Sequence, residues 1–174
     1  DLSLGKVNAP NLRSFEIICG GLPQEVIQSI RDAKLPELEE LRLYFGVEDY
    51  GFDGSIEDVK DLLEQSDFPK LKILGFCDSE IEDEICEAVL TSKYMKQIER
   101  LELSMGSLTD KGGQLLLDKL PEFPNIKELD LHYHYLSDEM MEKLENLPIE
   151  VDIDEQNEPD EWDDEIYYYP MLTE

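Results

Sequence analysis

The sequence predicts an α/β fold in which short parallel strands alternate with returning helices along a right-handed, horseshoe-shaped solenoid. Two observations support this class. One apolar pattern recurs five times along the chain, and apolar residues at helical spacing lie between its copies. We expect the strands to stack as a parallel sheet on the concave side, with the helices on the convex side.

Each copy of the pattern contains three apolar residues, separated by two residues and then by one. The last two alternate with polar neighbours, as in a half-buried strand. Strands are therefore expected near residues 12–18, 38–44, 71–77, 98–104 and 126–132. Val151 and Ile153 form a degenerate sixth copy.

The copies are spaced at nearly regular intervals. From one to the next, the last apolar residue advances by 26, 33, 27, 28 and 22 residues. These intervals are close to the 20–29 residues of a strand-and-helix repeat. The long interval needs an insertion, and the turn-prone segment 48–54 supplies one.

The segments between the strands carry helix signals. Ser55 with Asp58 three residues later is typical of a capping box, and Thr109 and Ser137 are each followed by an acid in the first helical turn. The apolar residues at helical spacing are Val26, Ile27, Ile30, Val59, Leu62, Leu63, Ile85, Ala88, Val89, Leu116, Leu120, Met140, Met141 and Leu144.

The two ends of the repeat array differ. We expect residues 1–147 to form the repeats, and residues 148–174 to form a degenerate last repeat with an acidic and aromatic C-terminal cap. Repeat arrays need a polar terminal cap, and the aromatic residues of the tail are predicted to fold back over the exposed edge of the core. The alternative is an interaction tail.

Several segments resemble known leucine-rich repeats. The segment 101–117, LELSMGSLTDKGGQLLL, resembles the ribonuclease-inhibitor type, whose strand is followed by Leu-x-Asp-x-Gly and a helix. Ile81 with Asp83 and Leu136 with Asp138 are weaker copies. The position usually filled by Asn or Cys differs, so main-chain groups in that turn need other partners. It holds Gly20, Gly46, Ser79, Gly106 and His134.

At finer detail, the chain resembles an uncharacterised family of bacterial leucine-rich-repeat proteins. The matching segments are Leu43-Tyr-Phe-Gly, Tyr50-Gly-Phe-Asp-Gly, His132-Tyr-His-Tyr-Leu-Ser-Asp-Glu-Met and the acidic tail that ends in Leu172-Thr-Glu. The resemblance implies that this chain corresponds to the C-terminal part of a longer member in a bacterial, cytoplasmic setting. It implies no reaction and no ligand.

Charge limits the classes of partner. Forty-three Asp and Glu residues against fifteen Lys and Arg give a net charge of −28, which would repel nucleic acid and anionic membranes.

The cysteines and the apolar runs indicate the compartment. The three cysteines have no metal-ligand spacing, which favours a reducing, cytoplasmic compartment, and no apolar run is long enough to span a membrane. Because the chain opens at Asp1, loss of an upstream targeting segment stays an open alternative.

The outward strand positions predict a binding surface. Equivalent residues of stacked strands form columns, one of which places Glu102, Asp130 and Asp152 in a file where like charges repel. A cationic partner would relieve this repulsion; alternatively, the carboxylates turn into water. The expected partner-binding residues are Glu16, Arg42, Tyr44, Arg100, Glu102, Glu128, Asp130, His132 and Asp152.

The resulting functional hypothesis is a non-catalytic module that binds a protein partner on its concave face, with a basic protein as one candidate. An acidic inhibitor or immunity protein that neutralises a basic enzyme is the main alternative, and a hidden enzymatic or calcium-binding function is the third. No cofactor and no metal site is predicted. His132 and His134 would point the same way on a regular strand, and the loop 48–54 is acidic, but neither has a complete ligand pattern.

Overall fold

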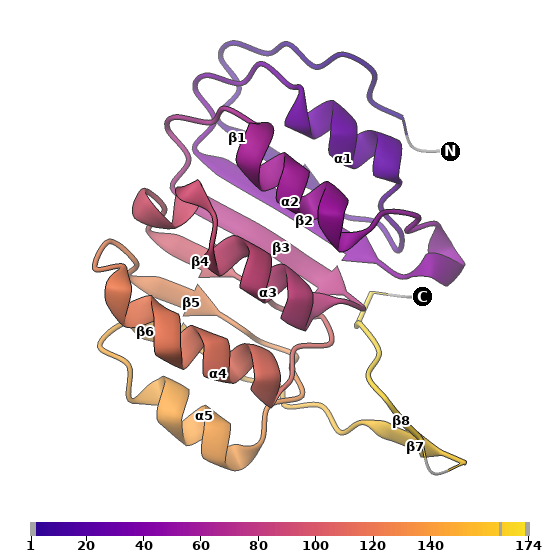
Figure 1. Cartoon of the computed structure of the whole chain (residues 1–174), viewed down its shortest axis with the longest axis vertical. Helices are drawn as coiled ribbons and strands as arrows, with labels where there is room; N and C mark the ends of the chain where they lie inside the picture. The colour runs from indigo at the N-terminus through magenta and orange to yellow at the C-terminus, as the bar shows by residue number, and fades with distance from the viewer. Residues whose placement is uncertain (1–2, 164, 173–174) are drawn as a thin grey trace.

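The computed structural model describes residues 3–163 and 165–172, and its main feature is a six-stranded parallel sheet (Figure 1). The predicted α/β class is confirmed: strands and helices alternate, and the strands follow the order of the sequence. The strands are β1 (Ser14–Ile17), β2 (Glu40–Gly46), β3 (Ile73–Ser79), β4 (Arg100–Glu102), β5 (Glu128–Asp130) and β6 (Glu150–Asp152).

The strands begin later than predicted. The first apolar residue of each copy lies in a turn before the strand, as when the Leu38 N–H donates to the Leu35 carbonyl and the Leu71 N–H to that of Phe68. Ladder pairing then starts two residues later, with Glu40 opposite Ile73. The first apolar residue therefore anchors the turn. The second and third belong to the strand in β1, β2 and β3, whereas β4 and β5 contain only the second.

Five helices cover one face of the sheet (Figure 1). They are α1 (Gln24–Arg31), α2 (Ile56–Gln65), α3 (Glu82–Leu90), α4 (Asp110–Lys119) and α5 (Asp138–Glu145). The core lies between the two layers, where Leu43, Phe76, Leu103 and Leu131 are fully buried. The other face carries no helix among the described residues, and we call it the open face.

Acidic residues in the first helical turns join successive helices. The Asp83 carboxylate in α3 accepts hydrogen bonds from the Thr109 N–H and hydroxyl and from the Gly112 N–H, at 3.0, 2.6 and 3.0 Å. Asp110 in α4 accepts the Ser137 N–H and hydroxyl at 2.7 Å each. Each acid thus satisfies otherwise unpaired donors at the start of the next helix.

The insertion between β2 and β3 packs on the preceding turn. It forms a short 3-10 helix, Glu48–Tyr50, and reverses at Gly51. Gly46 has a φ of +69°, and a Cβ there would lie 1.7 Å from the Gly20 carbonyl oxygen. This close backbone approach requires glycine.

The turns after the middle strands obtain their polar partners from buried side chains. The Glu82 carboxylate accepts the Ser79 N–H at 3.2 Å, and the Ser107 hydroxyl donates to the Ser79 carbonyl at 3.1 Å. Gly106 leaves room for this carboxyl group, because a Cβ would lie 2.2 Å from Glu82 Oε2. Burial raises the pKa of Glu82 well above its ordinary value of 4.5 and so favours the protonated carboxyl group.

This buried acid predicts a pH-dependent difference between Glu82→Gln and the parent chain. Because the pKa of Glu82 is higher in the folded chain, the unfolded chain releases this proton first as pH rises past 4.5, and the residue then lowers the free energy of unfolding. Glutamine does not ionise, so the Glu82→Gln variant does not lose stability in this way. Urea unfolding should give similar midpoints for both proteins at pH 4 and a growing advantage for the variant as pH rises above 4.5. An advantage no larger than that of the exposed Glu87→Gln would contradict the assignment.

The tail does not form the predicted cap. Residues Asp160–Trp162 (β7) and Glu165–Tyr167 (β8) form an antiparallel hairpin that extends beyond the sheet (Figure 1). The chain then returns across the strand ends, where the Met171 N–H donates to the Met105 carbonyl at 2.8 Å. Leu144 and Ile153 are already buried within the last repeat. The tail therefore pairs unfilled main-chain groups at the strand ends and does not cover the core edge.

None of the helices among the described residues is long and apolar enough to cross a membrane.

Candidate functional site

The open face carries the side-chain columns that the sequence predicts. The register pairs Glu16 with Arg42, Arg42 with Gly75 and Gly75 with Glu102. Glu102 is then opposite Asp130, and Asp130 is opposite Asp152. The strand register places equivalent residues of neighbouring strands side by side, which produces the columns. Side chains two residues apart lie on the same face of a strand, so neighbouring columns share the open face.

Glu102 is the centre of an ion-pair network on this face. Its side chain is only 6% exposed, and Arg42 binds it in a bidentate manner, with Nε 2.7 Å from Oε2 and Nη2 3.0 Å from Oε1. A third bond comes from Arg100 Nε, 2.6 Å from Oε1. The hydrogen bonds to Glu102 raise the pKa of Arg42 further, and the guanidinium is permanently charged.

Gly75 makes the contact between Arg42 and Glu102 possible. Arg42 lies on β2 and Glu102 on β4, so the arginine reaches across β3 at the position of Gly75. A Cβ at Gly75 would lie 2.9 Å from Glu102 Oε2 and 3.0 Å from Arg42 Cγ. A glycine inside a strand often marks such a close approach, and this signal was present in the sequence.

Arg100 extends the network toward the C-terminal strands. Its Nη1 lies 2.8 Å from Glu128 Oε2, and its Nη2 lies 3.1 Å from Asp130 Oδ2. The expectation of an uncompensated acidic file is therefore wrong for Glu102 and Asp130. Arg42 and Arg100, which are among the expected partner-binding residues, are bound by carboxylates of the same chain.

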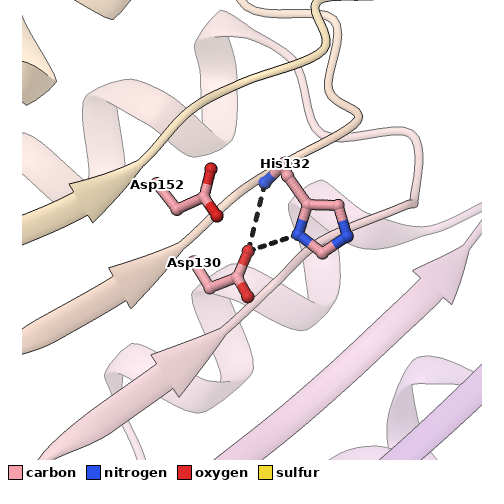
Figure 2. Close-up of side chains that lie close together, drawn as sticks. All are labelled: Asp130, His132 and Asp152. Carbon is pink, nitrogen blue, oxygen red and sulfur yellow. Dashed lines mark hydrogen bonds and ion pairs between the residues drawn. The ribbon is translucent and has the colours of Figure 1, made fainter.

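The last strands carry a cluster of Asp130, His132 and Asp152 (Figure 2). His132 Nδ1 lies 2.5 Å from Asp130 Oδ1, which also accepts the His132 N–H at 3.2 Å. One ligand atom from each of the three residues lies within 4.8 Å of the other two, so they could hold a divalent cation. The positive charge of the Arg100 guanidinium beside Asp130 repels a divalent cation at this cluster. A singly charged Lys or Arg side chain of a partner is repelled less.

Asp152 differs from the other acids of this file. It is exposed, and among the described residues no Lys or Arg forms an ion pair with it. Within the described part of the chain its carboxylate accepts only the Asp154 N–H, at 3.2 Å. Three acids of the open face that form no ion pair with a described residue, Glu150, Asp152 and Asp154, therefore lie together on β6 and just after it, whereas Glu16 is alone on β1.

The remaining predicted residues lie farther from this acidic end. Glu16 is exposed on the edge strand β1, and Tyr44 on β2 is half-buried. Burial raises the pKa of Tyr44 to about 12, so its hydroxyl stays neutral. Glu128 is partly exposed while it binds Arg100. The structure thus brings the central and C-terminal residues together and leaves Glu16 apart.

His132 and His134 do not point the same way. Tyr133 between them has a φ of +56°, which ends the strand alternation on which that expectation rested. His134 is fully buried: its Nε2 bonds to the Ile153 carbonyl at 2.9 Å, and its Nδ1 accepts the Leu136 N–H at 3.0 Å. His134 thus pairs main-chain groups of the turn after β5.

The acidic loop 48–54 has a structural use. Asp53 Oδ1 accepts the Gln24 N–H at the start of α1, at 2.7 Å. This carboxylate therefore satisfies a helix N-terminus of the neighbouring repeat.

The three cysteines are free, and Cys77 and Cys86 are buried. Burial raises the pKa of both thiols, which disfavours the reactive thiolate form.

The class that these observations define is an open α/β fold with a parallel sheet, one helix-covered face and one charged face. Comparison with family models and with curated proteins finds no match. The chain is similar to a Bacteroides fragilis protein whose crystal structure was determined as a structural genomics target. The two share 40% sequence identity and a TM-score of 0.87 over 98% of this chain. The chain spans 47% of the length of that relative.

Proposed function

We propose that this chain is a leucine-rich-repeat solenoid with ribonuclease-inhibitor-like repeats. The buried apolar strand positions at a repeating register support this assignment. So do the acids of the Leu-x-Asp positions, which join each helix to the next. In such an array the open face is the concave surface, which solenoids use for extended binding.

We further propose that the open face binds a partner protein that presents Lys or Arg, without catalysis. The observation that carries this proposal is the cluster of acids that the described chain leaves without an ion pair, Glu150, Asp152 and Asp154, at the C-terminal end of the sheet. Arginines fix Glu102 and Asp130 in the centre, whereas Asp152 at the end has no cationic partner among the described residues. A cationic side chain placed there gains attraction from several carboxylates.

The internal network suits a binding surface because it is already organised. Arg42 and Arg100 hold their carboxylates before any partner arrives, so little side-chain freedom is lost at these positions on association. The rim charges would then set the association rate and its dependence on salt.

Affinity capture with charge-matched variants tests this function. The open-face variant carries Glu150→Gln, Asp152→Asn and Asp154→Asn; the helix-face control carries Asp61→Asn, Glu64→Gln and Glu87→Gln. All six residues are exposed, and both variants change net charge equally. The same basic protein should be recovered with the parent chain and the control, and lost with the open-face variant and at high salt. Equal recovery with all three proteins would contradict the proposal.

A further inference from the structure

The β7–β8 hairpin carries a face of exposed aromatic side chains that the open-face proposal does not use. In the hairpin register Asp160 pairs with Tyr167 and Trp162 with Glu165, so these four residues share one face. Tyr169 continues it, since its ring stacks on that of Tyr167 at 6.2 Å and 8°. Trp162, Tyr167 and Tyr169 therefore form one aromatic face, in which Trp162 is 73% and Tyr169 51% exposed.

The hairpin is held firmly at its base. The Asn157 N–H donates to the His134 carbonyl at 2.7 Å before the hairpin. After it, the Tyr135 hydroxyl donates to the Tyr169 carbonyl at 2.8 Å, and the Tyr135 and Tyr168 rings meet edge to face at 5.1 Å. Between these anchors the hairpin extends away from the sheet (Figure 1). The rings are thus presented outward by the fold.

Carboxylates surround the aromatic face. Asp160 and Glu165 lie on it, and Glu165 Oε2 accepts the Tyr167 hydroxyl at 2.6 Å. From Leu144 to Glu174 the sequence has twelve carboxylates and no Lys or Arg. A second copy of the chain would bring the same charges together, so charge complementarity selects a cationic occupant.

Arginine fits this combination better than lysine. A guanidinium is planar and weakly hydrated, so it can lie on an aromatic ring while its edge donates to a carboxylate. An ammonium group is compact and strongly hydrated, and it offers no stacking surface. A two-stranded hairpin is also marginally stable alone in water, so an occupant that covers its rings would stabilise it.

We propose that the aromatic face of Trp162, Tyr167 and Tyr169 binds the arginine side chains of an arginine-rich segment in a partner protein. The guanidinium groups stack on the rings, and Asp160 and Glu165 accept their hydrogen bonds. This surface is separate from the open face, so each can be disabled without the other.

Trp162 supplies the readout, because it is the only tryptophan of the chain. The probes are two synthetic peptides of alternating cationic and serine residues, one with arginine and one with lysine, titrated in physiological salt. The arginine peptide should change the tryptophan emission saturably and bind roughly fivefold or more tightly than the lysine peptide, given the strength of exposed cation–π contacts. Equal affinity of the two peptides, or unchanged emission, would overturn the proposal.

Two variants locate the binding. Tyr167→Leu with Tyr169→Leu keeps apolar area and the tryptophan but removes two rings, and it should weaken arginine-peptide binding about tenfold. Asp152→Asn on the open face should leave this binding unchanged. Circular dichroism checks that both variants are folded. Loss of affinity in Asp152→Asn alone would place the peptide on the open face, and an emission change that depends on protein concentration without peptide would indicate a second copy; either result would overturn the proposal.

Discussion

Replacing Arg42 by leucine should destabilise the protein by about 3 kcal/mol, because it leaves the buried Glu102 carboxylate without its bidentate partner. Removing one member of a buried ion pair costs about 3–5 kcal/mol, and the lower end applies here because Arg100 still binds Glu102. Leucine is close in volume to the apolar part of the arginine side chain, so the loss should come mainly from the orphaned charge. Urea unfolding of the parent and the variant measures it.

Two further proteins make this result interpretable. Lys70→Leu breaks the exposed ion pair with Glu37 and should cost less than about 1 kcal/mol. Adding Glu102→Leu to Arg42→Leu removes the orphaned charge and should restore most of the lost stability. If Arg42→Leu costs no more than Lys70→Leu, or if the double variant is no better than the single one, Arg42 does not neutralise Glu102.

The second large effect is expected for Asp83→Ala. This carboxylate accepts two backbone N–H groups and one hydroxyl from the start of α4, and its loss leaves those N–H groups unpaired between two helices. The expected cost is about 2 kcal/mol, by the loss of a cap and of hydrogen bonds to a charged group. In a protein of this size that corresponds to a fall of about 4–8 °C in Tm.

Glu87→Ala is the matched control for Asp83→Ala. It removes one carboxylate from the same helix at an exposed position and should change stability by less than about 0.5 kcal/mol. Calorimetry compares the two variants directly. An equal Tm for both would show that Asp83 does not join α3 to α4 energetically.

The fold class follows from the sequence because the apolar pattern repeats, and each repeat adds independent support for the same strand and helix. The register follows from the same pattern, so the columns that contain Glu102, Asp130 and Asp152 are correct. Strand bounds are less accurate because Leu38 and Leu71 satisfy the pattern while lying in turns.

The partners of the site residues could not be predicted from the sequence and are known only from the structure. The columns predict which face of the sheet a side chain lies on, but not how far the side chain extends along that face. Arg42 extends across β3 to bind Glu102 because Gly75 has no side chain there. The expectation that His132 and His134 point the same way was wrong for another reason. Tyr133 between them has a positive φ, so the regular alternation of side chains along a strand ends there. The cap prediction for the tail was wrong because the tail is anchored at the strand ends, by main-chain groups and by single side chains such as Tyr135, and these contacts follow no repeating sequence pattern.

The open face is central to the proposed function, and site-specific photo-crosslinking in the source cell tests it most directly. A photoreactive residue replaces exposed Asp152 or Asp154 at the acidic end of the open face, or exposed Glu57 on α2 as the helix-side control. The proposal predicts that both open-face positions cross-link to one protein with a basic surface and that Glu57 does not. Cross-links from Glu57 alone, or from neither open-face position, would contradict it.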